Sequence, residues 1–130
     1  MNKNDVNHSS FTYGPLEALS RVMLKENLGL TGTEISINRL PAGQSIPFVH
    51  AHKQNEEVYL FLQGKGAFWL DGEVLEVGAG TAVRVSPAAG RCIKADPGES
   101  LAYICIQARE NSLQQATRED GIILDVKTGW

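Results

Sequence analysis

From Thr31 onward, short apolar stretches alternate with turn residues at intervals of about ten positions, which is typical of a β-sandwich or barrel. Asp71-Gly72 separates two such stretches and predicts a hairpin with a type I′ turn, which needs positive φ at both central residues. Further segments rich in β-branched and aromatic residues, as strands are, cover residues 58–62, 81–85 and 101–106. The pattern predicts an all-β fold, an antiparallel barrel or jelly roll of eight or more strands.

The two ends of the chain have a different pattern. Apolar residues recur at helical spacing over residues 15–28, and Gly29 offers a stop, so we predict a short helix or an irregular clasp there. A capping-box spacing predicts a second short helix over residues 112–118, and residues 121–126 are a candidate final edge strand. His8 lies in a polar segment and is expected to be solvated.

Length and composition indicate one domain. The chain has 130 residues, 42% of them hydrophobic and 21% charged, which is the balance of a globular protein with a substantial core. We therefore predict a single domain over residues 1–130, with its barrel core at about 33–108. A core of this size folds without disulfides or a structural metal, so any bound metal would serve function.

Charge and hydropathy exclude several partners. The net charge is -3 and the Lys and Arg residues are scattered, so nothing predicts nucleic-acid binding. No apolar run approaches the roughly 20 residues that span a bilayer, and the first residues lack the apolar core of a signal peptide. Cys92 and Cys105 lie in strand-like segments and match no zinc-knuckle spacing. We predict no membrane association and a cytoplasmic protein with reduced thiols.

One short stretch carries candidate chemistry. His50 and His52 are two residues apart, so on a strand their side chains project from the same face. A tight reversal after His52 would bring the Glu57 carboxylate to the same centre. Two histidines and a carboxylate with open coordination positions describe the facial triad of non-haem Fe(II), and they also suit a catalytic zinc. We predict a divalent transition metal, with iron, manganese, zinc and nickel as candidates. Glu56 faces the opposite way and cannot act together with Glu57.

These residues resemble the first motif of the cupin family, which has a glycine, then His-x-His, a Glu four or five residues on, and a glycine seven residues after the Glu. Gly64 lies seven residues after Glu57, which selects Glu57 as the matching carboxylate. Six residues separate Gly43 from His50, where the family has five. The resemblance implies the family's jelly-roll barrel, or double-stranded β-helix, with short helical segments at both ends here.

The second cupin motif is degenerate. Counting from Pro87 places Cys92 at the position of the fourth metal ligand, whereas counting from Gly90 gives Ile93, which cannot coordinate metal. No histidine follows His52. We expect Cys92 to line the site as a passive wall that does not bind the metal. Three protein ligands and water molecules would then complete the coordination shell of the metal.

The position of Cys92 rests on a predicted hairpin. Residues 96–99, Asp-Pro-Gly-Glu, join segments 90–95 and 100–107, so these segments are expected to pair and to place Cys92 opposite a residue near Ile104.

Aromatic residues of the same stretch are candidates for ligand contact. Residues two positions apart on a strand point to the same face, so Tyr59 is expected on the face of Glu57 and Phe48 on the face of His50. Both are expected at the barrel mouth, where small ligands bind in this architecture. Phe61 is expected to fill the interior.

Two functions remain open at this point. The first is a small metal-dependent enzyme acting on a small polar molecule, for which the cupin resemblance implies dioxygenase, isomerase or lyase chemistry. The second is a non-catalytic module that senses or binds a small ligand with or without metal.

Assembly is suggested by the strand edges and the chain ends. Sheet edges must be covered or paired, and the segments before Thr31 and after Gln107 carry apolar patches. We expect a homodimer in which these segments exchange across a two-fold axis.

Overall fold

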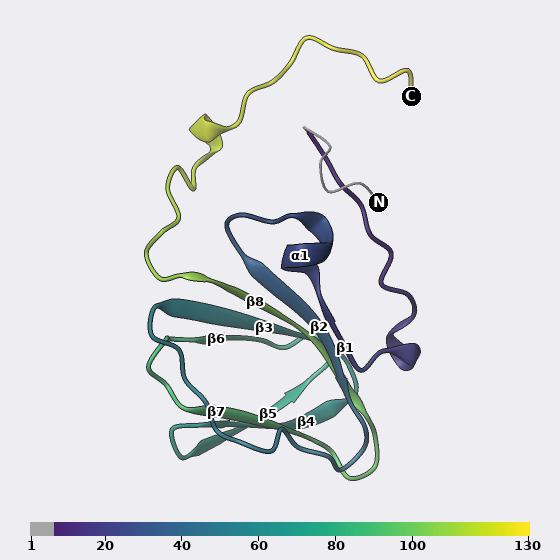
Figure 1. Cartoon of the computed structure of the whole chain (residues 1–130), viewed down its shortest axis with the longest axis vertical. Coiled ribbons are helices and arrows are strands. Elements are labelled where there is room, and N and C mark those ends of the chain that lie inside the picture. Colours follow the sequence, from purple (N-terminus) through teal and green to yellow (C-terminus); the bar gives the residue numbers. More distant parts are fainter. Residues whose placement is uncertain (1–6) are drawn as a thin grey trace.

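The computed structural model describes residues 7–130 and consists of two antiparallel sheets that face each other (Figure 1). The five-stranded sheet has the order β1 (Arg21–Met23), β2 (Glu34–Leu40), β8 (Leu101–Arg109), β3 (Asn55–Gln63), β6 (Ala82–Val85). The three-stranded sheet has the order β5 (Glu73–Gly78), β4 (Lys65–Leu70), β7 (Arg91–Ala95). The predicted all-β jelly roll is confirmed.

The core lies between the two sheets and follows from the alternation of side chains along each strand. Along β3, Glu57, Tyr59 and Phe61 are buried while their neighbours are partly exposed. Phe61 packs with Phe68 of β4 at 6.0 Å between ring centroids, so it fills the interior as expected. Because alternate residues point inward, one strand supplies both core side chains and the polar group of the candidate site.

Two turns of the structure require the glycines at positions 64 and 72, which the sequence pattern marked as turn residues. Asp71 and Gly72 connect β4 to β5 with φ of 49° and 93°, which is the predicted hairpin turn. Gly64 separates β3 from β4 with φ of 79°, and a Cβ added there would lie 1.7 Å from the carbonyl oxygen of Ser100. Only glycine permits this close approach of two backbones.

The ends of the chain carry short helical segments, as expected, but these cover fewer residues than the sequence pattern indicated. Residues 15–28 form a turn of 3₁₀ helix, the short strand β1 and the five-residue helix α1 (Leu24–Leu28), so the expected short helix is present but covers only the last part of the segment, before Gly29. Pairing of β1 with β2 overrides the helical spacing, because sheet hydrogen bonds outweigh local propensity. Residues 112–118 form no helix beyond the start of a 3₁₀ turn at Arg118–Asp120, and 121–126 form no strand.

The predicted hairpin between residues 90–95 and 100–107 is also wrong. β7 pairs with β4 in the three-stranded sheet, where Cys92 is the partner of Trp69, whereas β8 lies in the five-stranded sheet. The connection crosses from one sheet to the other, which gives each sheet an apolar face against its partner. None of the helices within residues 7–130 has the length and apolar character needed to cross a membrane.

Candidate metal centre

The structure brings the three predicted ligands to one point. The candidate ligand atoms of His50, His52 and Glu57 all lie within 4.8 Å of one another. Glu57 comes from β3, but the histidines lie in the segment between β2 and β3 and not on a regular strand as expected. His50 instead forms an isolated bridge with Arg91, with backbone hydrogen bonds of 3.2 and 3.0 Å, and this keeps the segment extended.

The chemistry of the donor set fits a divalent metal. His50 Nδ1 and His52 Nε2 are buried and have no hydrogen-bond partner within the described residues. His52 Nε2 lies 3.2 Å from Glu57 Oε2, but the two groups are not aligned as a hydrogen bond. Buried polar atoms normally have partners, and two imidazole nitrogens beside a carboxylate form a set of ligand atoms that could hold a cation.

Arg91 is the residue that the sequence analysis missed. Its Nη1 donates to Glu57 Oε1 at 2.6 Å, and its exposed fraction is only 1%. The alternation of side chains along β7 could have predicted its burial, because Arg91 lies on the same face as the buried residues Ile93 and Ala95. The Tyr59 hydroxyl donates to the same Oε1, which leaves Oε2 on the side of His52.

The protonation states of the site suit metal ligation. Burial alone would raise the pKa of Glu57, but the Tyr59 hydroxyl, the Arg91 guanidinium and the Cys105 thiol lower it below its ordinary value. Burial lowers the pKa of His50, so its imidazole is neutral over a wider range and keeps a lone pair for a metal. The carboxylate is therefore ionised and the imidazole neutral.

Cys92 lies outside this centre. Its thiol donates to the carbonyl oxygen of Ile46 at 3.2 Å, and it is not among the side chains that converge with His50. Strand parity gives Cys92 the opposite facing to Arg91 and Ile93, although Cys92 still borders the adjoining cavity. The arrangement favours a passive Cys92, as expected.

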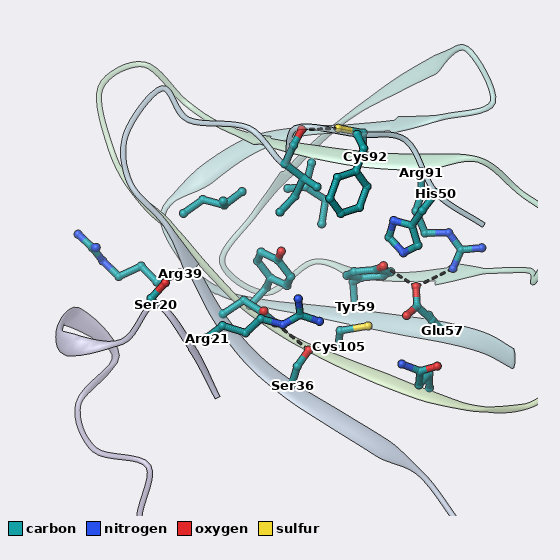
Figure 2. Close-up of a pocket in the computed structure, with 17 residues that line it drawn as sticks. Ser20, Arg21, Ser36, Arg39, His50, Glu57, Tyr59, Arg91, Cys92 and Cys105 are labelled. Carbon is teal, nitrogen blue, oxygen red and sulfur yellow. Dashed lines mark hydrogen bonds and ion pairs between the residues drawn. The ribbon is translucent and has the colours of Figure 1, made fainter. Parts of the chain in front are cut away.

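A cavity of about 220 Å³ adjoins the centre (Figure 2). Tyr59 and Phe48 both belong to its lining, which is where the sequence analysis expected them. Tyr59 is buried and bound to Glu57, whereas Phe48 is 58% exposed and lies against His50 at 5.9 Å between ring centroids. Phe48 thus covers one side of His50 at the mouth, and Tyr59 forms the inner wall.

The fold and donor set together define a jelly-roll barrel with a candidate two-histidine, one-carboxylate centre. The family model described as "Cupin domain" matches residues 36–107, which is more than half of the chain. This chain therefore belongs to the cupin family.

Solved structures agree with this assignment. A cupin protein of Bacteroides fragilis is 42% identical over 91% of this chain and 98% of its own, with a TM-score of 0.86. The cupin domain of Schizosaccharomyces pombe Cnp3 is 20% identical over 61% of this chain and 57% of its own, with a TM-score of 0.57. The DMSP lyase DddQ of Ruegeria pomeroyi is 19% identical over 64% and 41%, with a TM-score of 0.54. The last two share only the fold with this chain. A search of curated proteins finds no match.

Proposed function

We propose that this cupin binds one divalent transition metal through His50, His52 and Glu57, and acts as a metal-dependent enzyme on a small polar molecule in the adjoining cavity. The observation that carries the proposal is the pair of buried, unpartnered imidazole nitrogens beside an ionised carboxylate. Iron, manganese, zinc and nickel all accept this donor set.

The residues around the triad have separable roles in such an enzyme. When bound, the metal would supply a Lewis acid or activate oxygen, which suits the dioxygenase, isomerase and lyase reactions of the family. Tyr59 and Arg91 hold Oε1 of Glu57 and so fix the orientation of Oε2. Burial raises the pKa of Tyr59 well above its ordinary value, so its hydroxyl keeps its proton and serves as a donor, not as a base. Phe48 limits access of water to His50.

A second candidate is a non-catalytic module that binds a small ligand without metal. The ion pair between Arg91 and Glu57 favours it, because the guanidinium already neutralises the only acidic side chain that residues 7–130 contribute to the cavity lining. The three-ligand centre favours the enzyme, since it leaves coordination positions open for substrate. Metal content separates the two functions.

The test is metal analysis of protein purified without a metal-affinity tag. We expect one divalent transition metal per chain after dialysis against a mixture of such metals. His52→Ala should abolish this binding with an unchanged circular dichroism spectrum. The control is His8→Ala, because His8 is exposed in the N-terminal segment and should have no effect. Unchanged metal content in His52→Ala would refute the triad, and a consistently metal-free wild type would favour the binding module.

A further inference from the structure

The cavity beside the triad has a second polar side, formed by β1, β2 and β8. Register places Arg21 of β1 opposite Asn38 of β2, and Asn38 opposite Tyr103 of β8. Directly paired residues point to the same face of a sheet. Asn38 and Tyr103 are buried and line the cavity, so the face that carries Arg21 is the interior face.

Arg21 itself is exposed, and it extends over the cavity from the edge of the five-stranded sheet. Figure 2 shows its guanidinium directed into the cavity, whereas Arg39, which also belongs to the lining, directs its side chain away from it. Burial raises the pKa of Tyr103 and the positive charge of Arg21 opposes this shift, so Arg21 lies within electrostatic reach of the tyrosine.

The balance of charge in the cavity is positive. Among the described residues of the lining, Glu57 is the only acidic one, and Arg91 pairs with it at 2.6 Å. Within residues 7–130, Arg21 forms no ion pair with an acidic side chain. A cation directed into a cavity without a counter-ion attracts an anionic ligand, and a guanidinium matches the two oxygens of a carboxylate.

The neighbours of Arg21 supply suitable donors. One N–H of the Asn38 amide donates to Ser36 Oγ at 2.9 Å, which leaves its second N–H for a ligand. Burial raises the pKa of Tyr103, so its hydroxyl keeps its proton. The cavity of about 220 Å³ is smaller than the roughly 300–1,000 Å³ of sites for drug-sized ligands. Its occupant is a small molecule.

We propose that Arg21, Asn38 and Tyr103 form an anion subsite that binds the carboxylate of a small organic acid, whose other end faces His50 and Glu57. The inference deepens the proposed function and rests on it in taking this cavity as the substrate site. It does not follow from the family assignment, because Arg21 lies outside the matched residues 36–107.

The experiment titrates succinate, and its uncharged diamide succinamide, into the full chain and follows binding by isothermal titration calorimetry. Both chelator-treated and metal-loaded protein are used. We expect Arg21→Gln to weaken succinate binding about tenfold in each form, because a charge-assisted hydrogen bond is lost. Arg39→Gln is the matched control and should change affinity by less than about twofold. Succinamide should bind at least about tenfold more weakly than succinate.

A second variant tests the same subsite without touching the arginine. Tyr103→Phe keeps the buried ring and removes the hydroxyl, so it should weaken succinate binding while the protein stays folded by circular dichroism. The subsite is refuted if wild-type protein does not bind succinate, if succinamide binds equally well, or if Arg21→Gln and Tyr103→Phe both bind succinate like the wild type.

Different results would refute the metal-dependent function and the anion subsite. Protein that contains no metal but binds succinate through Arg21 refutes the metal-dependent function and supports the subsite. Protein that holds metal through His52, but whose succinate affinity is the same in Arg21→Gln, supports the metal centre and overturns the subsite.

Discussion

Arg91 Nη1 lies 2.6 Å from Glu57 Oε1, and both side chains are almost completely buried, with exposed fractions of 1% and 4%. The same guanidinium donates to the carbonyl oxygens of Ser86, Pro87 and Ala89. The backbone of Arg91 bonds to His50, and the carbonyl of Pro87 also accepts from the amide of His52. Through its side chain, its backbone and the shared Pro87 carbonyl, Arg91 therefore connects all three candidate ligands to the loop before β7.

We predict that Arg91→Leu destabilises the protein by about 3 kcal/mol, because it leaves the Glu57 carboxylate buried without its counter-charge. The double variant Arg91→Leu/Glu57→Leu should be less destabilised than Arg91→Leu alone, since no unpaired charge remains. Urea unfolding of metal-free protein measures both effects.

The control for this prediction is the exposed pair of Arg84 and Glu56, which are 3.2 Å apart on the outer side of β3 and β6. Arg84→Leu should change the free energy of unfolding by less than about 1 kcal/mol. Equal losses in Arg84→Leu and Arg91→Leu would contradict the role given to burial.

Cys92 should be alkylated at the same rate with and without a chelator. Its thiol bonds to the Ile46 carbonyl and does not belong to the cluster of candidate ligands, so metal should not protect it. Mass spectrometry of iodoacetamide-treated protein, loaded with zinc and then stripped, measures the rate at Cys92 separately from that at buried Cys105. Protection by zinc that disappears with chelator would make Cys92 a fourth ligand.

Gly64→Ala should destabilise the fold by about 3 kcal/mol, because the new Cβ would collide with the Ser100 carbonyl and the φ of 79° is strained for alanine. Gly72→Ala is the matched control. It also has positive φ, but nothing lies within 4 Å of its added Cβ, so about 1 kcal/mol is expected. Thermal unfolding of both variants checks the difference, and similar midpoints would argue against the steric explanation.

We expect a homodimer whose C-terminal segment packs on a second copy. This segment extends away from the barrel (Figure 1), and its apolar side chains are exposed, Ile123 completely. Exposed apolar patches mark association sites. Light scattering at micromolar concentration should report a dimer for the wild type and a monomer after Ile122→Ser/Ile123→Ser/Leu124→Ser. The control Val74→Ser, an exposed apolar site on β5, should remain a dimer, and a monomeric wild type would refute the expectation.

Local features of the sequence were enough to predict much of the fold. The Asp71-Gly72 turn and the alternation of apolar residues act between neighbours in the chain, so they could be recognised without a structure. The spacing of His50, His52, Glu57 and Gly64 predicted a convergent triad, because two residues on an extended segment share a face. The structure brings the candidate ligand atoms of His50, His52 and Glu57 within 4.8 Å of one another, although the histidines lie outside regular strands.

Relationships between distant segments were decided only by the tertiary structure. The helical spacing over residues 15–28 could not show that Arg21–Met23 pairs with β2, because that pairing depends on hydrogen bonds to another part of the chain. The turn at 96–99 predicted a hairpin, but its flanking strands belong to different sheets. Arg91 looked like one of many scattered surface cations. Its burial is possible only because Glu57, 34 residues earlier, lies across the barrel, and a counter-charge at that separation is set by folding.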